Sequence, residues 1–168
     1  MRTRGAVVWF TGLPASGKST LARRVRDALC EGVILDSDEL HAVLGTEAYA
    51  HAERDAFYGV LGRLASMLAR DGQLVLVAAT APCRAHREAA RALAPCFLEV
   101  YVRTPLETCA VRDPKGLYAR ARAGDAPDLP GVGAPYEPPL APDAIADGGH
   151  DDVATETIVA LVERAAAT

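Results

Sequence analysis

Residues 6–19 of the chain read AVVWFTGLPASGKS, and this stretch decides the fold. Its first six residues are apolar apart from the closing threonine, as in a parallel strand that is covered on both faces. Its last eight residues match the Walker A pattern GxxxxGK[ST] at every fixed position, with Gly12, Gly17, Lys18 and Ser19. A helical pattern follows directly. The sequence therefore predicts a strand, a phosphate-binding loop and a helix in succession.

The residue types of this loop suit the binding of a nucleoside triphosphate. Glycines allow backbone angles that turn successive N–H groups toward phosphate oxygens. Lys18 can reach the β- and γ-phosphates and is expected to be catalytic, and the Ser19 hydroxyl is expected to meet Mg²⁺ bound with ATP. A glycine-rich turn with a chance lysine is the alternative, which the flanking strand and helix disfavour. The expected ATP-binding residues are Gly12, Leu13, Pro14, Ala15, Ser16, Gly17, Lys18, Ser19 and Thr20.

The rest of the chain repeats the succession of strand and helix, which indicates a parallel sheet with crossover helices. Further strands are expected at residues 33–35, 74–79 and 97–102, with a weaker signal at 144–146. Helices are expected at residues 19–29, 50–71, 85–93 and 155–166, and a short one begins at Pro105. We expect one α/β domain over residues 1–168, because no linker or internal repeat divides the chain.

Composition and charge narrow the range of functions. The 168 residues are 50% hydrophobic and 24% charged, which is enough for a full core. The net charge of −4 argues against a nucleic-acid partner. No apolar run reaches the roughly 18–20 residues that span a membrane. The four cysteines form no CxxC pair, so neither a zinc site nor a redox dithiol is indicated, and a cytoplasmic protein with reduced thiols is expected.

Two carboxylates, Asp36 and Asp38, follow the second expected strand. The carboxyl ends of parallel strands face the ligand crevice of an open sheet. Either side chain can therefore take a hydroxyl proton, orient a hydroxyl group or hold Mg²⁺ through water. The alternative for Asp38 is to cap a helix that begins at Glu39.

Two other segments have two interpretations each. Residues 124–142 are rich in proline and glycine, and such a long stretch without periodicity is either disordered or a functional loop. Arg84, Arg87 and Arg91 lie on one side of an expected helix, because their spacings are three and four residues. They form either a solvated stripe or a rim that attracts anions.

Several further motifs make the sequence similar to the adenylylsulfate (APS) kinase family. They are TPLETC at 104–109, RDPKGLY at 112–118, ARAG at 121–124, PYEP at 135–138 and WFTGL at 9–13. The resemblance covers most of residues 7–139. It implies a three-layer P-loop kinase with a mostly parallel central sheet flanked by helices, and a lid loop at about residues 115–142. The implied reaction transfers the γ-phosphoryl group of ATP, bound with Mg²⁺, to the ribose 3′-hydroxyl of APS or an APS-like nucleotide.

The resemblance also implies roles for single residues. Asp36 matches the implied proton acceptor, Lys115 a catalytic residue near the phosphates, and Arg112 an arginine beside the ATP adenine. The implied acceptor-binding residues are Asp36, Asp38, His41, Arg54, Phe57, Thr80, Ala81, Arg84, Lys115, Gly116, Leu117 and Leu129. Homodimer formation is a further property that the family resemblance implies.

Several positions depart from the family pattern. Glu39 stands where the family has an asparagine, and residues 79–82 read ATAP where the family has FISP. His41 stands where the family has an arginine, Phe57 where it has an asparagine, and Leu129 where it has a lid phenylalanine. The residues on the ATP side match the pattern. Two alternatives to APS therefore stay open, namely a different acceptor such as a modified nucleoside diphosphate, and a non-catalytic nucleotide-binding protein. The expected partners are ATP and a small nucleotide-like acceptor.

Overall fold

A computed structural model describes residues 5–46 and 51–167 of the chain. Its centre is a parallel five-stranded sheet in the order β2-β3-β1-β4-β5. The strands are β1 (Ala6–Thr11), β2 (Val33–Asp36), β3 (Leu74–Ala78), β4 (Phe97–Val102) and β5 (Ala144–Ala146). The α/β prediction is confirmed, including the short strand at 144–146.

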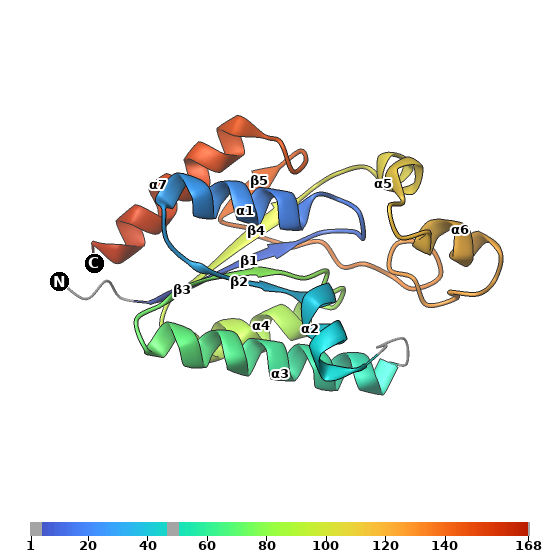
Figure 1. The fold of residues 1–168 in the computed structure, drawn as a ribbon, viewed down its shortest axis with the longest axis horizontal. Helices are drawn as coiled ribbons and strands as arrows, with labels where there is room; N and C mark the ends of the chain where they lie inside the picture. Colours follow the sequence, from blue (N-terminus) through green and yellow to red (C-terminus); the bar gives the residue numbers. More distant parts are fainter. Residues whose placement is uncertain (1–4, 47–50, 168) are drawn as a thin grey trace.

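Helices cover both faces of the sheet, which gives the three layers (Figure 1). Helices α1 (Lys18–Leu29) and α7 (Asp152–Ala166) pack on one face, and α3 (His51–Arg70) and α4 (Arg84–Leu93) on the other. The three shorter helices are α2 (Ser37–Leu44), α5 (Leu106–Arg112) and α6 (Leu117–Arg122). Helices α5 and α6 lie beyond the carboxyl ends of the strands, where a ligand crevice is expected.

The uniform burial of β1 explains why its sequence is apolar throughout. Val8 and Phe10 belong to the core under α1 and α7, whereas Val7 and Trp9 belong to the core under α3 and α4. All four side chains are 1% exposed or less. Burying such side chains stabilises the fold by about 1.5–3 kcal/mol each. This strand fixes the position of the loop that follows it.

Two local expectations differ from the structure. The residue that caps α2 is Asp36, whose side chain accepts a hydrogen bond from the backbone N–H of Asp38, so Asp38 is not the cap. Arg87 on α4 belongs neither to a solvated stripe nor to a rim that attracts anions. That side chain is 1% exposed and donates from Nε to Oε1 of Glu99 on β4 at 2.7 Å. Sequence spacing identifies the face of a helix but not the partner on the neighbouring strand.

Residues 124–142 form an ordered connection rather than a helix or a strand in the structure. The carbonyl of Leu129 accepts hydrogen bonds from the N–H groups of residues 132, 133 and 134, which makes a tight turn. The far end of the segment is tied to the domain, because the Glu137 N–H donates to the carbonyl of Pro82 at 2.8 Å. Within the described part of the chain, no helix is long and apolar enough to cross a membrane.

Candidate active site

The phosphate-binding loop turns between β1 and α1 as the motif predicts. Gly17 has a φ of 102° and stands at the start of α1. A side chain at this position would come within 2.5 Å of the backbone nitrogen of Gly149, so only glycine fits. The hydroxyl of Thr104 donates to the carbonyl of Ser16 at 2.6 Å and holds the loop from the β4 side.

Lys18 lies at the bottom of this loop and is only 8% exposed. Its Nζ donates to the carbonyls of Leu13 at 2.8 Å and Gly12 at 3.1 Å. Burial lowers the pKa of Lys18 to about 8, although nearby carboxylates, Asp38 foremost, favour the charged form. An anion that replaced the two carbonyls would offset this cost of burial. Lys18 is therefore placed where its Nζ can bind an anionic group such as a phosphate.

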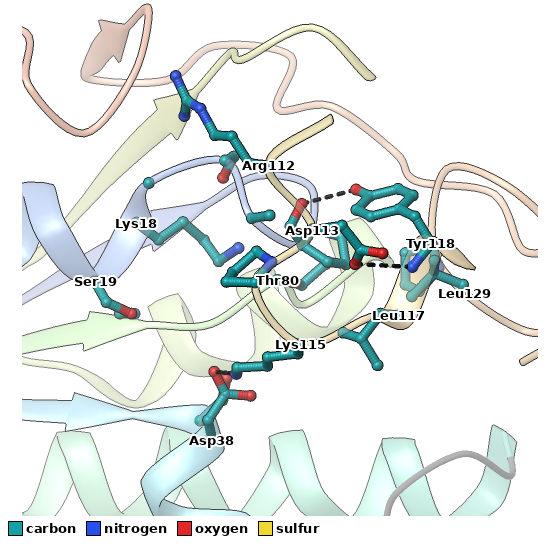
Figure 2. A pocket seen from close by; sticks show the side chains of 18 of the residues that line it. Lys18, Ser19, Asp38, Thr80, Arg112, Asp113, Lys115, Leu117, Tyr118 and Leu129 are labelled. Atoms are coloured by element: carbon teal, nitrogen blue, oxygen red, sulfur yellow. Dashed lines mark hydrogen bonds and ion pairs between the residues drawn. The ribbon is translucent and has the colours of Figure 1, made fainter. Parts of the chain in front are cut away.

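The two carboxylates after β2 have different surroundings. Asp36 is 5% exposed and accepts hydrogen bonds from the Ser19 hydroxyl and from the N–H of Asp38. Asp38 is exposed and forms an ion pair with Lys115 (Figure 2). Asp36 is thus fixed beside the phosphate loop, whereas Asp38 can exchange its partner.

The pair of Asp38 and Lys115 joins α2 to the segment between α5 and α6 across the mouth of the site. The two side chains are 62% and 50% exposed. An exposed ion pair of this kind contributes about 1 kcal/mol or less, so a ligand can replace it at small cost. Both residues line the same cavity.

The cavity has a volume of about 640 Å³, which is in the range of small-molecule sites. Its walls come from the phosphate loop, α2, α3, the segment from α5 to α6, the connection after α6 and the loop before α7. The polar and charged side chains that line it are Ser16, Lys18, Ser19, Thr20, Ser37, Asp38, His41, Thr46, Arg54, Tyr58, Thr80, Arg112, Asp113, Lys115, Tyr118, Asp128 and His150. The cavity therefore has the lysine of the phosphate loop at one end and both acidic and basic side chains at the other.

Contacts from two sides hold the connection after α6 over this cavity. Leu129 is 5% exposed and packs with Tyr118 and Cys109. The Tyr118 hydroxyl donates to the carbonyl of Pro14 in the phosphate loop at 2.7 Å (Figure 2). On the opposite side, Arg54 of α3 donates to the carbonyl of Asp128 at 3.0 Å. The connection thus covers the cavity as a lid.

Aromatic rings form the wall of the cavity near α2 and α3. The ring of His41 stacks on the ring of Phe57, with centroids 3.6 Å apart and an angle of 13°. Tyr58 lines the cavity next to Phe57, and burial raises the pKa of its hydroxyl to about 12. At neutral pH this hydroxyl is a hydrogen-bond donor rather than a negative charge.

A sequence model described as adenylylsulphate kinase matches residues 4–147. The chain belongs to the adenylylsulfate kinase family. An adenylyl-sulfate kinase of Geotalea uraniireducens (strain Rf4) is 41% identical, with coverage of 98% of this chain and 83% of that protein. The bifunctional enzyme NodQ of Azospirillum brasilense is 44% identical over 97% of this chain, which spans 28% of that longer protein.

A solved structure of another family member shares this architecture. The Mycobacterium tuberculosis APS kinase CysC, in complex with AMPPNP and APS, is similar with a TM-score of 0.88 and 37% sequence identity. The match covers 96% of this chain and 99% of that chain. The fold class expected from the family resemblance is confirmed.

The cavity brings together many of the residues that the sequence assigned to ATP and the acceptor. The members that line it are Pro14, Ala15, Ser16, Gly17, Lys18, Ser19, Thr20, Asp38, His41, Arg54, Thr80, Arg112, Lys115, Leu117 and Leu129. The assigned residues that do not line it are Gly12, Leu13, Asp36, Phe57, Ala81, Arg84 and Gly116. Gly12 and Leu13 still contribute, since their carbonyls hold Lys18.

The other five residues lie outside the lining for different reasons. Phe57 is buried behind His41, and Ala81 is buried completely. Arg84 is turned to the end of the lid, where its Nε donates to the carbonyl of Pro138 at 2.8 Å. Gly116 has a φ of 67° and is the N-cap residue that precedes α6. Asp36 lies behind the lining, bonded to Ser19.

Sequence reasoning missed Tyr58, Asp128 and His150, which also line the cavity of this family member. Tyr58 follows Arg54 by four residues, so helical periodicity places both on one face of α3. This spacing could have identified Tyr58 as a residue of the site. Asp128 and His150 lie in irregular segments, where no periodic pattern indicates the direction of a side chain.

Proposed function

We propose that this chain transfers the γ-phosphoryl group of ATP to the 3′-hydroxyl of APS and releases ADP. The observation that carries the proposal is a single lidded cavity in which a phosphate loop faces Asp38 and Arg54. The cavity occurs in a chain that aligns over 96% of its length with an APS kinase bound to AMPPNP and APS.

The phosphate loop serves the ATP half of the reaction. Backbone N–H groups of the phosphate loop bind the phosphates, and Lys18 leaves the carbonyls of Gly12 and Leu13 to meet the γ-phosphoryl group. Its charge is worth most where phosphate charge is redistributed in the transition state. Arg112, on the cavity wall, contacts the adenine of ATP.

The donor set beside the loop suits Mg²⁺. The Ser19 hydroxyl and the Asp36 carboxylate are hydrogen-bonded to each other and would hold Mg²⁺ through oxygen atoms, which are the ligands that this ion prefers. Mg²⁺ in phosphoryl-transfer sites is usually held by one or two protein oxygens together with the substrate phosphates. When bound, Mg²⁺ neutralises phosphate charge; Asp36 keeps Ser19 oriented.

Asp38 is the residue that takes the proton of the acceptor hydroxyl. The family resemblance implied Asp36 for this role, but Asp36 carries two hydrogen bonds and does not line the cavity. Asp38 lines it and is held only by the exposed pair with Lys115. Release of Lys115 toward the phosphates frees the carboxylate for the hydroxyl group and brings a second cation to the transferred phosphoryl group.

The lid excludes water from the γ-phosphate while both substrates are bound. Water competes with the acceptor hydroxyl in any phosphoryl transfer, so a closed site favours transfer over hydrolysis. Arg54 connects the two functions, because it faces the acceptor and donates to the lid at Asp128. Homodimer formation and a cytoplasmic location stay predictions of the sequence.

The test is ADP release with MgATP, with and without APS. We expect APS-dependent release in the unchanged protein, and a loss of at least about 10²-fold in kcat in Lys18→Ala, since such a charge contributes several kcal/mol. A kcat within threefold of the parent in Lys18→Ala would refute the role of the loop. ADP release that requires another nucleotide instead of APS would favour the alternative acceptor, which the stacked His41 and Phe57 support.

A further inference from the structure

A buried arginine outside the cavity connects two segments that border it. Arg87 on α4 is 1% exposed, and its guanidinium donates to acceptors on three different segments. Nε donates to Oε1 of Glu99 at 2.7 Å, which compensates the buried charge. Nη1 donates to the carbonyl of Ala81, and Nη2 donates to the carbonyl of Glu137 at 2.6 Å. The guanidinium thus holds two backbone segments in addition to its counter-ion.

The first of these segments is the turn at residues 80–82, which follows β3. In the sheet β3 lies between β2 and β1, so the turn lies between the strand that ends at Asp36 and the strand that leads into the phosphate loop. Thr80 lines the cavity (Figure 2). The acceptor hydroxyl meets the γ-phosphoryl group between these two strand ends. The position of the turn therefore affects how the acceptor is oriented toward the phosphoryl group.

The conformation of this turn depends on side chains that hold it. Ala81 has a φ of 40°, which residues with a side chain rarely adopt, and such strain persists only where the surroundings fix it. The carbonyl of Ala81 is held by Arg87. The preceding carbonyl, of Thr80, accepts from Oγ1 of Thr11 at 2.6 Å. Two successive carbonyls of the turn therefore each have a side-chain donor.

The second segment is the stem of the lid, residues 136–138. The Tyr136 hydroxyl is 3.0 Å from Oγ1 of Thr11, the last residue of β1. Tyr136 is the donor of this bond, because the only proton of the Thr11 hydroxyl is donated to Thr80. The ring of Tyr136 lies 5.9 Å from the guanidinium carbon of Arg87. The stem thus contacts both of the side chains that hold the turn.

Glu137 joins the stem to the turn and to the start of α4. Its N–H donates to the carbonyl of Pro82 at 2.8 Å, and its carboxylate accepts from the N–H of Arg84 at 2.7 Å. A negative charge is favourable at this position, because the N-terminus of a helix carries a partial positive charge. The turn, the stem and α4 therefore form one connected unit, with Arg87 buried inside it.

We propose that Arg87 is a positioning residue of the acceptor site, which holds the turn at 80–82 and the stem at 136–138 in place beside the phosphate loop. Arg87 does not line the cavity, so it acts through these two segments. Its hydrogen bonds in the described part of the chain go to Glu99, Ala81 and Glu137 and not to the phosphate loop. Loss of these bonds should therefore impair use of the acceptor and spare the binding of ATP. The inference rests on the proposed function, because the acceptor is APS.

The variant Arg87→Lys tests this inference with the positive charge beside Glu99 retained. Lysine presents its donors from one nitrogen, so it cannot span the three acceptors that the guanidinium fork meets. We expect kcat/KM for APS to fall about tenfold or more, which is a typical effect of losing a hydrogen bond to a charged group. KM for ATP should change by less than about threefold. Steady-state ADP release, with each substrate varied in turn, measures both constants.

Arg91 provides the matched control on the same helix. Its Nη2 donates to Oε2 of Glu99 at 3.1 Å, and its other ion pair in the described structure is with Glu88, so it pairs with the same carboxylate without holding the turn or the stem. Arg91→Lys should leave both constants within about twofold of the parent. Ile158→Val, in the core on the opposite face of the sheet, is the control for a general loss of stability. It should lower the melting temperature and leave both constants unchanged.

A second variant disconnects the stem without changing the buried ion pair. Tyr136→Phe removes only the hydroxyl that donates to Thr11 and keeps the ring beside Arg87. We expect kcat/KM for APS to fall about threefold to tenfold, as for the loss of one neutral hydrogen bond, with KM for ATP unchanged. This variant decides the inference if Arg87→Lys does not fold.

The results that overturn the inference are distinct from failure of the proposed function. An unchanged kcat/KM for APS in folded Arg87→Lys, equal losses for APS and ATP, or the same loss in Arg91→Lys would show that Arg87 only stabilises the fold. If Arg87→Lys does not fold, an unchanged kcat/KM for APS in Tyr136→Phe has the same meaning. Absence of APS-dependent turnover in the unchanged protein refutes the proposed function, and the inference with it.

Discussion

Replacement of Asp38 by asparagine separates the chemistry of the site from its architecture. Asp38 is held by one ion pair, with Lys115, and both side chains are at least half exposed. Loss of that pair costs about 1 kcal/mol or less, so Asp38→Asn should fold like the parent. Loss of a positioned proton acceptor lowers kcat by about 10²-fold or more, which is at least about 2.7 kcal/mol of transition-state stabilisation. The chemical effect therefore exceeds the structural effect.

The assay is steady-state ADP release, with KM determined for ATP and APS and a melting curve for each variant. We expect Asp38→Asn to lose kcat with KM for ATP changed by less than about threefold. Asp36→Asn is the matched variant, because asparagine still caps α2 and accepts from the N–H of Asp38. It should weaken MgATP binding as well as kcat, since it changes the partner of Ser19. If Asp38→Asn keeps kcat and Asp36→Asn loses it at unchanged ATP affinity, Asp36 is the proton acceptor and our assignment is wrong.

The lid and the last helix give two more predictions. Protease cleavage within residues 124–142 should slow when MgADP and APS are both saturating, because the lid then contacts both ligands; unchanged cleavage speaks against a closing lid. Asp151→Ala removes the N-cap of α7, which accepts from the N–H groups of Ala154 at 2.9 Å and Asp147 at 3.0 Å, and should lower the free energy of unfolding by about 1–2 kcal/mol. The hydrogen bond from Asp147, followed by that from Ala154, lowers the pKa of Asp151 below 3.8. The stability that the ionised Asp151 contributes is therefore present above pH 3.8 and is lost as the pH falls through the pKa of the folded state. Urea unfolding at pH 7 and at acid pH measures the free energy of unfolding of Asp151→Ala, and Asp152→Ala is the control because Asp152 is exposed. Equal free energies of unfolding for Asp151→Ala and Asp152→Ala at pH 7 would contradict the prediction.

The predictable parts of the fold are those in which a short stretch of sequence carries its own physical reason. The strand at 6–11 is uniformly apolar because both faces of the sheet are covered, and the loop after it needs glycine at Gly17, where the backbone of Gly149 leaves no room for a side chain. The apolar run and the motif glycine are both visible in the sequence, whereas the contact between Gly17 and Gly149 is not. The carboxyl-end location of the site follows from the parallel order of the strands.

The parts that sequence reasoning missed depend on side-chain contacts that no periodic pattern indicates. Arg87 is buried because Glu99 lies beside it on β4, and helical spacing contains no information about that residue. Helix α6 has only six residues, and its start is fixed by the side chain of Asp113, which accepts from the N–H groups of Tyr118 and Ala119. This local capping by a side chain determines a short helix more strongly than intrinsic propensity does.

The acceptor side of the site also depends on a contact that sequence patterns do not indicate, and this contact bears on function. A motif comparison assigns His41 and Phe57 to two separate positions, one for an arginine and one for an asparagine. In the folded chain the two rings stack at 3.6 Å, so the substitutions act as one unit. His41 lines the cavity, whereas Phe57 does not. The stack could not be predicted from the motif, because the motif does not contain the contact.

The most direct test of phosphoryl transfer to APS is the identity of the product. The protein is incubated with APS and ATP that carries a labelled γ-phosphoryl group, and the label is located by ³¹P NMR and mass spectrometry. We predict that the label appears on the 3′-oxygen of APS in a one-to-one ratio with ADP, and that Lys18→Ala forms neither product at a comparable rate. Consumption of ATP with the label in inorganic phosphate, or with APS recovered unlabelled, would contradict the account.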